Sequence, residues 1–313
     1  MVTLFLYNLI FTQSFSNESV NVTNIVNSIF GQEIENNVIP SINNTNVTER
    51  KLEKGTLLLD NLIVPIKYEK IGNLSLFEND IILTNEIIGG KAAIDKFIKT
   101  DPWINGIIPY IIHPDTPNKE NINQAITYVM DNTPIKFIPV KIVNGIIQDA
   151  NFVVFVPHNS ICASPIGMMN GNNLVLGNSY KGQPVFVSDW CKTGDLIHEL
   201  GHTLGLWHEH TRCDRDQYIE IVWNNIQEDS KHNFEVICDP TDPSKASLSP
   251  ISYGEYDYCS MMHYPERAEN SINHSSPIII PKQQVVGCEH IGQTGKLSEV
   301  DLDAIYYIYS FLG

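Results

Sequence analysis

Apolar residues in the middle of the chain follow two kinds of spacing. Between positions 117 and 130 they recur at helical intervals and form one stripe, which predicts a helix with a buried face. The stripe consists of Ile122, Ala125, Ile126, Val129 and Met130. Short apolar runs predict strands at 106–112, 135–140, 151–156 and 172–176. A strand, a helix and then further strands predict a mixed sheet covered by a few helices, which is an α+β arrangement.

The first third of the chain has a different character. Residues 1–16 are apolar and end in small or polar residues, as in a secretory signal peptide; a buried strand is the alternative. Residues 57–82 alternate short apolar runs with charges, which predicts a few extended segments. Gly89 and Gly90, followed by small residues, mark a flexible and cleavable joint. We therefore divide the chain into a signal peptide at 1–16, a leading segment at 17–90 and a main domain at 91–313.

Charge and cysteine content narrow the class of protein. The chain has 36 acidic and 20 basic residues, so a nucleic acid is not an expected partner. No apolar run reaches the length of a membrane span. An even number of cysteines indicates disulfides, an oxidising compartment and a secreted protein, whereas six buried free thiols are the alternative. The cysteines are Cys162, Cys191, Cys213, Cys238, Cys259 and Cys288.

The chemistry is concentrated between residues 193 and 216, where the sequence reads TGDLIHELGHTLGLWHEHTRCDRD. His198 and His202 stand one helical turn apart, so both imidazoles leave the same face and can bind one metal ion. Glu199, beside the first of them, is placed to act as a general base on a metal-bound water. Gly205 can end the helix in a left-handed conformation, so that the chain returns His208 as a third ligand. Three histidines leave a coordination position open, which is the arrangement of a catalytic zinc rather than a structural one.

The specificity of this pattern depends on its length. Two histidines at i and i+4 are commonly ordinary surface residues. The longer string HExxHxxGxxH requires five residue identities at fixed spacing to agree on one geometry. The full string therefore favours a catalytic zinc site.

The string from His198 to His208 resembles the extended zinc motif of the metzincins. Glu209, directly after the third histidine, resembles the residue at that place in the astacin family. The run Ser260-Met261-Met262-His263-Tyr264 resembles the Met-turn of that family. Residues 103–110 and 291–301 also resemble the two ends of astacin catalytic domains. The resemblance covers about residue 92 to the C-terminus. It implies a zincin-like catalytic domain with a mixed twisted sheet, a zinc-site helix, a Met-turn and a C-terminal helix, preceded by a pro-segment.

The resemblance also implies roles for single residues. Met262 would form the hydrophobic floor beneath one catalytic Zn²⁺, and Tyr264 would be a fifth zinc ligand that swings away to bind the transition state. Glu209 would face the new N-terminus that forms on activation. Cys162 and Cys191 resemble a family disulfide. The other four cysteines allow three pairings, among them a Cys213–Cys259 bridge that would brace the site.

Residues 76–81, with the sequence LFENDI, resemble the pro-segment motif in which an aspartate replaces the catalytic water on zinc. Asp80 is the matching residue, and an exposed loop acid is the alternative interpretation. Asn79 stands where the family usually has glycine, and asparagine tolerates a left-handed backbone better than most residues. Residues 17–90 are therefore expected to be an inhibitory pro-segment.

The expected protein is a secreted, monomeric zinc endopeptidase, made as a zymogen that an activating protease cleaves near Gly90. Glu199 and Tyr264 would carry the hydrolysis of internal peptide bonds in protein or peptide substrates, with the substrate paired along an edge strand at 172–176. Arg267 and Lys282 are candidates for binding an acidic substrate residue, and the favoured alternative is that each is an ordinary surface charge. Two other classes remain open, a catalytically silent binding protein and an adhesive protein with structural zinc.

Overall fold

The computed structural model describes most of the chain from Arg50 onward, in the ranges 50–59, 62–71, 74–83, 96–98, 101–143, 146–169, 182–237, 253–268, 270–292 and 295–310. The predicted signal peptide, the joint at Gly89-Gly90 and the predicted strand at 172–176 lie outside these residues. None of the helices in the described ranges combines the length and apolar character needed to cross a bilayer.

The main domain is built on a four-stranded sheet in the order β12-β10-β6-β7, whose described strands all pair in parallel. The strands are β6 (Ile107–Ile112), β7 (Lys136–Pro139), β10 (Phe152–Pro157) and β12 (Gly182–Val187). Three of them lie where the apolar runs predicted strands. Both β10 and β12 are buried along their whole length, as expected for strands covered on both faces.

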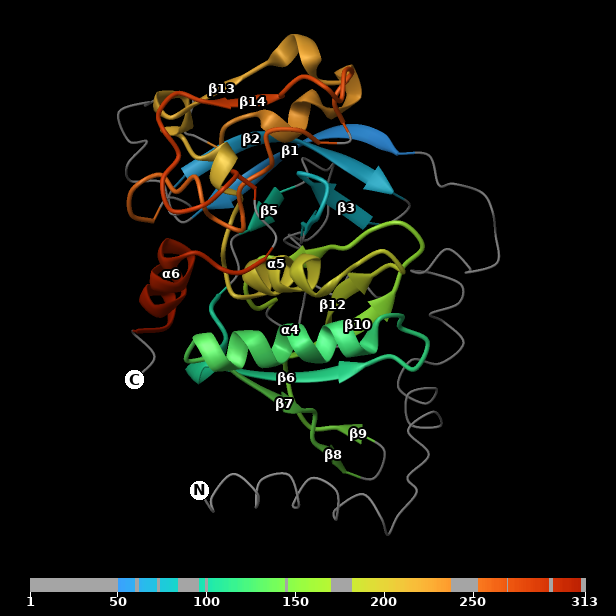
Figure 1. Ribbon diagram of the computed structural model, residues 1–313. Coiled ribbons are helices and arrows are strands. Elements are labelled where there is room, and N and C mark those ends of the chain that lie inside the picture. The colour runs from blue at the N-terminus through green and yellow to red at the C-terminus, as the bar shows by residue number, and fades with distance from the viewer. Residues whose placement is uncertain are drawn as a thin grey trace.

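Two helices cover one face of this sheet (Figure 1). The first is α4 (Lys119–Asn132), which confirms the helix predicted from the apolar stripe; Ile122 and Val129 are fully buried. The second, α5 (Thr193–Thr203), carries the metal motif and packs beside α4. Apolar side chains of both helices and the sheet form one core, which fixes α5 firmly.

The C-terminal helix α6 (Glu299–Tyr309) joins the same core through Ile305 and Tyr309. It is tied to the start of the domain, because the Tyr309 hydroxyl accepts a hydrogen bond from the Trp103 backbone (3.4 Å). The indole of Trp103 in turn donates to the Thr203 carbonyl at the end of α5 (3.0 Å). These contacts clamp α5 between the two ends of the domain.

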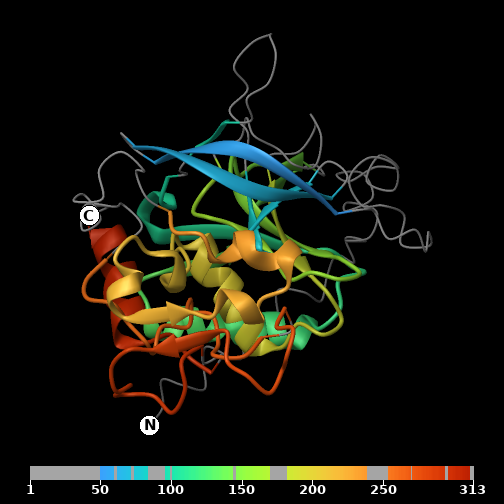
Figure 2. The same ribbon diagram turned by 90° about the horizontal axis from the view of Figure 1, so that it is seen from above.

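The leading segment forms most of a second, six-stranded sheet in the order β11-β4-β3-β2-β1-β5. Its long antiparallel hairpin, drawn in blue, lies across the top of the domain in Figure 2. The strands are β1 (Lys51–Leu59), β2 (Leu62–Ile71), β3 (Leu74–Phe77), β4 (Ile81–Ile82), β5 (Lys96–Ile98) and β11 (Ser164–Pro165). The extended segments predicted at 57–82 are confirmed.

The leading segment is joined to the main domain by hydrogen bonds and by apolar contact. β4 pairs in parallel with β11, which belongs to the main domain. Val64, Tyr68 and Phe77 share a core with Trp207 and Ile237. Trp207 directly precedes the third histidine of the metal motif, so the leading segment packs against the metal motif itself.

The remainder of the domain contains little regular structure. A short antiparallel pair, β13 (Ile219–Ile221) and β14 (Ile279–Pro281), is surrounded by the 3-10 helices η2 (Glu209–Thr211), η3 (Arg215–Gln217), η4 (Trp223–Asn225) and η5 (Glu228–Phe234). A small hairpin, β8 (Ile142–Val143) with β9 (Ile146–Ile147), projects beyond β7 (Figure 1). The part around β13 and β14 has its own apolar core, which includes Ile219 and Phe234.

Candidate metal centre and catalytic cleft

The helix α5 presents two of the predicted ligands, and a glycine directs the chain to the third. The Asp195 carboxylate accepts a hydrogen bond from the Lys192 backbone N–H (2.8 Å) and so stabilises the first turn. After the helix, Gly205 adopts a φ of 110°, a conformation that favours glycine, and its N–H donates to the His202 carbonyl (2.8 Å). The chain reverses there, and His208 returns to the face that carries His198 and His202.

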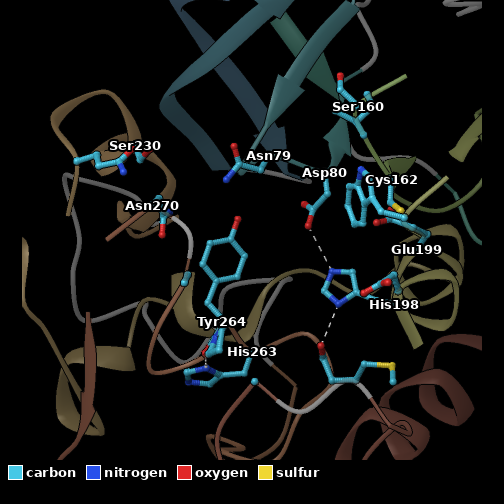
Figure 3. A pocket seen from close by; sticks show the side chains of 18 of the residues that line it. Asn79, Asp80, Ser160, Cys162, His198, Glu199, Ser230, His263, Tyr264 and Asn270 are labelled. Atoms are coloured by element: carbon cyan, nitrogen blue, oxygen red, sulfur yellow. Dashed lines mark hydrogen bonds and ion pairs between the residues drawn. The ribbon is translucent and has the colours of Figure 1, made fainter. Parts of the chain in front are cut away.

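The three histidines meet the Asp80 carboxylate. One ligand atom from each of the four residues can be chosen so that all lie within 4.8 Å of one another. The Nε2 atoms of His198 and His208 lie 3.5 and 3.3 Å from Asp80 Oδ2, and His202 Nε2 lies 3.7 Å from Asp80 Oδ1. His198 Nε2 is 3.2 Å from His208 Nε2. Figure 3 shows Asp80 pointing at His198 across the mouth of the cleft.

These separations are close to those expected around one tetrahedral zinc ion. Donor atoms at ordinary zinc–nitrogen and zinc–oxygen distances are roughly 3.3–3.6 Å apart along the edges of a tetrahedron. Two buried atoms also have no hydrogen-bond partner, His202 Nε2 and Asp80 Oδ1, and a bound cation would satisfy both. Burial raises the pKa of Asp80, but the charge of His208 and hydrogen bonds from the histidines outweigh it and hold the pKa well below its usual value. Asp80 is therefore an anionic donor.

The outward nitrogen of each histidine is also held. His198 Nδ1 lies 2.9 Å from the Met261 carbonyl, and His202 Nδ1 lies 2.8 Å from the Leu206 carbonyl. His208 Nδ1 lies 2.7 Å from a carboxylate oxygen of Glu78. An acceptor at Nδ1 places the proton there and leaves Nε2 free to bind a metal.

Glu199 lies beside the metal group in a cavity of about 600 Å³, which Asp80, His198 and Tyr264 also line. Its side chain is buried, and Oε2 has no hydrogen-bond partner. Burial, and after it the nearby carboxylates of Asp80 and Asp195, hold the pKa of Glu199 well above its usual value. A carboxylate with a raised pKa can both accept a proton from water and return it.

Met262 packs against Gly201 of the helix α5, and its role as the floor beneath zinc stays a prediction. A Cβ atom added at Gly201 would come within 2.8 Å of the Met262 sulfur, so glycine is required for this close approach. The Met262 carbonyl accepts a hydrogen bond from the Glu209 backbone (3.0 Å), which joins the turn to the residue after the third ligand. The turn is therefore joined both to the helix that carries His198 and His202 and to the segment that follows His208.

The Met-turn is held from the C-terminal helix by Asp301. Its carboxylate accepts hydrogen bonds from the Ser260 hydroxyl (2.6 Å), the Met261 N–H (2.8 Å) and the Ser298 N–H (2.9 Å). Burial raises its pKa, and these hydrogen bonds oppose the rise. The contacts of Asp301 to the turn could not be predicted from the sequence, because they span about 40 residues.

We expect Asp301→Ala to lower the free energy of unfolding by about 3 kcal/mol, since two buried donors, on Ser260 and Met261, and a half-buried one on Ser298 lose their acceptor. Asp303→Ala is the matched control, because Asp303 is exposed on the same helix. Equilibrium unfolding in guanidinium of the zinc-loaded protein measures both. Equal stabilities for the two variants would show that Asp301 does not hold the turn.

Tyr264 borders the cavity, and its ring stacks on His210 with centroids 3.8 Å apart. Its hydroxyl donates to the Glu78 carbonyl (2.5 Å). Its predicted role as a fifth zinc ligand stays a prediction.

Glu209 accepts hydrogen bonds from Arg212 Nη1 (3.1 Å) and the Asp257 N–H (2.8 Å). Residues 84–95 lie outside the described ranges, so the predicted contact of Glu209 with a new N-terminus also stays a prediction.

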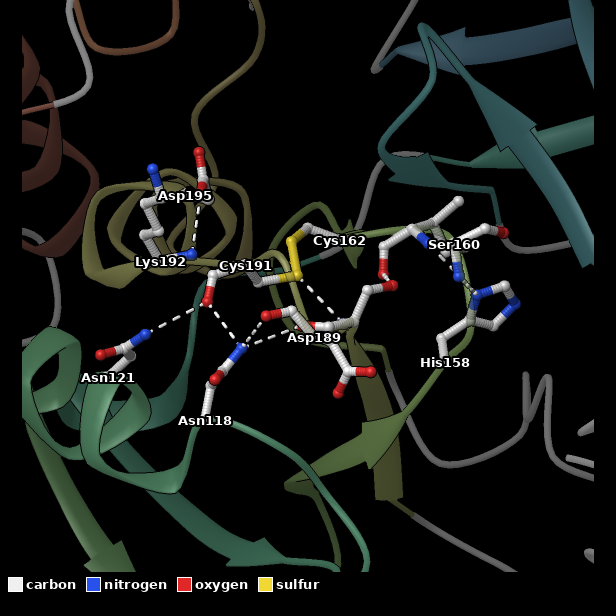
Figure 4. Close-up of a disulfide and its surroundings, with 11 residues drawn as sticks. Asn118, Asn121, His158, Ser160, Cys162, Asp189, Cys191, Lys192 and Asp195 are labelled. Carbon is white, nitrogen blue, oxygen red and sulfur yellow. Dashed lines mark hydrogen bonds between the residues drawn. A yellow bond between two sulfur atoms is a disulfide. The ribbon is translucent and has the colours of Figure 1, made fainter.

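The predicted disulfide between Cys162 and Cys191 is present, at the edge of the cleft (Figure 4). Asn118 Nδ2, at the start of α4, donates to the carbonyls of Asp189 (2.8 Å) and Cys191 (3.0 Å) and fixes this edge. The sequence offered no signal for this role of Asn118.

A second disulfide joins Cys259 and Cys288, so the bridge considered between Cys213 and Cys259 is wrong. Cys259 directly precedes the Met-turn, and its partner Cys288 lies 29 residues further along the chain. Cys213 is also disulfide-bonded, and Cys238 lies outside the described residues.

The two cations proposed to bind an acidic substrate residue lie away from the cavity lining. Arg267 is exposed and its Nη1 lies 3.5 Å from Glu266. The ammonium of Lys282 binds the Asp216 carbonyl. Among the described residues that line the cavity, the cationic side chain is Arg50, which comes from the leading segment.

Comparison with known proteins identifies the family. The family model Astacin, which describes a family of peptidases, matches residues 96–310. Zinc metalloproteinase nas-4 of Caenorhabditis elegans is 29% identical over 260 residues, which cover 78% of this chain and 71% of that protein. Dorsal-ventral patterning protein tolloid of Drosophila melanogaster is 34% identical over 222 residues, or 67% of this chain and 18% of that protein.

A solved structure supports the assignment. The high choriolytic enzyme 1 of Oryzias latipes, a hatching enzyme and zinc protease, aligns with a TM-score of 0.53 and 28% identity, covering 67% of this chain and 93% of that one. The match with bone morphogenetic protein 1 of Xenopus laevis, at 30% identity, spans 66% of this chain and 27% of that protein. The expected metzincin fold and zinc dependence are confirmed. The chain belongs to the astacin family of zinc metallopeptidases.

Proposed function

We propose that this chain is a secreted endopeptidase that hydrolyses internal peptide bonds and is made as a latent precursor. The observation that carries the proposal is the convergence of three histidine Nε2 atoms and the Asp80 carboxylate at separations of 3.2–3.7 Å. His198, His202 and His208 would hold the zinc. Asp80 would occupy the position at which water must enter, so the described state is the latent one.

The residues around the metal centre would each have a separate role in hydrolysis. When bound, zinc activates a water molecule and polarises the scissile carbonyl. Glu199 accepts the proton of that water and passes it to the leaving amine. Tyr264, once released from the Glu78 carbonyl, donates a hydrogen bond to the developing oxyanion.

Latency would follow from the leading segment, which we assign to residues 17–90 after a signal peptide at 1–16. Its sheet packs over Trp207 and pairs with β11 beside the cleft. An activating protease would cleave near Gly90 and leave a monomeric catalytic domain at 91–313. The disulfides Cys162–Cys191 and Cys259–Cys288 agree with an extracellular location, because disulfides persist in oxidising compartments.

The test is hydrolysis of casein or an internally quenched peptide by trypsin-processed protein. Treatment with o-phenanthroline should abolish hydrolysis because the chelator removes the zinc that the three histidines would hold. Added zinc should restore it. A folded, processed and zinc-loaded sample without hydrolysis would instead indicate a catalytically silent binding protein.

A further inference from the structure

Glu78 contacts the metal centre through two different groups, although it stands two residues before the blocking aspartate. Its carboxylate lies 2.7 Å from His208 Nδ1, and both side chains are completely buried. Its backbone carbonyl accepts the hydroxyl of Tyr264 (2.5 Å). One residue of the leading segment thus contacts a predicted zinc ligand and a predicted catalytic residue.

The acceptor on His208 differs from those on the other two histidines. His198 and His202 are held by the backbone carbonyls of Met261 and Leu206, which belong to the main domain. His208 is held by a carboxylate, and that carboxylate belongs to the leading segment. A carboxylate at the outer nitrogen orients the imidazole and makes it a more basic ligand than a carbonyl does.

The backbone at Glu78 is shaped for these contacts. Glu78 and Asn79 adopt φ values of 50° and 73°, in the left-handed region that few residues other than glycine enter readily. The turn is anchored on both sides, since Phe77 pairs with Ile81 and the Ser164 N–H donates to the Asp80 carbonyl (2.9 Å). Such a strained turn persists only where its surroundings determine it.

We propose that Glu78 is a positioning residue that orients His208 and so retains zinc in the precursor. This rests on the proposed function, in which residues 17–90 leave on activation. The leading segment then has two effects on the metal centre. Asp80 blocks the position at which water must enter, and Glu78 strengthens the binding of zinc by His208. Removal of the segment takes the Glu78 carboxylate from His208 Nδ1, so the processed enzyme releases zinc faster than the precursor.

The test measures zinc release rather than hydrolysis. Zinc-loaded full-length precursors are mixed with excess chelator, and the released metal is followed with a zinc-sensitive dye. Glu78→Ala should release zinc about 10- to 100-fold faster than wild type, since loss of such a partner costs that much affinity. Glu78→Gln keeps a neutral acceptor and should release zinc at an intermediate rate. Glu53→Ala, which removes a leading-segment carboxylate paired with Lys51, should match wild type.

Wild-type release rates in both Glu78 variants would overturn the proposal. If Glu78→Ala does not fold, as judged by circular dichroism, Glu78→Gln decides: accelerated release supports the role and a wild-type rate refutes it. The release rates can be measured whether or not the processed enzyme hydrolyses peptides, because zinc release requires no hydrolysis. An enzyme that stays silent after processing would refute the endopeptidase proposal whatever the release rates.

Discussion

Replacement of Glu199 by glutamine is expected to lower kcat of the processed enzyme by about 10²–10⁴-fold, the range of a general acid–base group. Glu199 follows the ligand His198 on α5 and lines the same cavity. Its buried Oε2 atom has no partner, so it is available to a water molecule at the centre. Glutamine has nearly the same shape but cannot accept the proton, so the defect falls on the chemical step.

Steady-state hydrolysis of a quenched peptide measures this effect, and zinc stoichiometry is determined on the same samples. Glu199→Gln should still bind one zinc, because Glu199 is not among the four converging donors. Glu220→Gln is the matched control, since Glu220 is exposed on β13. Unchanged hydrolysis in the Glu199 variant would exclude this residue as the general base.

The second large effect is expected in the precursor. Asp80→Ala should allow hydrolysis without any cleavage of the chain, at a rate about tenfold or more above wild-type precursor, because the fourth ligand position is then free. The rate should remain below that of processed enzyme, since the leading sheet still packs over Trp207 beside the site. The measurement is peptide hydrolysis by intact precursor, with the chain length verified by mass spectrometry.

Processing provides the internal control for this variant. After cleavage the substituted segment is gone, so Asp80→Ala and wild type should have the same activity. A variant that is silent as precursor and normal after processing would show that coverage by the sheet, rather than Asp80, causes latency.

The zinc group could be predicted from the sequence because its geometry is local. Helical periodicity places His198 and His202 on one face, and Gly205 permits the reversal that returns His208. The helix α4 could be predicted for the same reason, because its buried stripe repeats every turn. Asn79 adopts the left-handed backbone expected of it in place of glycine.

Three other contacts between distant parts of the chain could not be predicted. The hydrogen bond between Glu78 and His208 joins residues 130 positions apart, and in the sequence Glu78 looks like an ordinary acid in a loop. The carboxylate of Asp301 reaches the Met-turn about 40 residues away. The partner of Cys259 could not be predicted either. The number of cysteines fixes how many pairings are possible, but it does not show which sulfur atoms lie close together.

The most direct test follows one zinc-loaded sample of the full chain through limited proteolysis, with hydrolysis of a quenched peptide and the size of the chain recorded at each time. We expect hydrolysis to be absent at first and to rise in step with loss of the leading segment, and to vanish on chelation. Hydrolysis that is maximal before cleavage would contradict latency. Its absence after complete cleavage, in folded protein that retains zinc, would contradict the assignment as an endopeptidase.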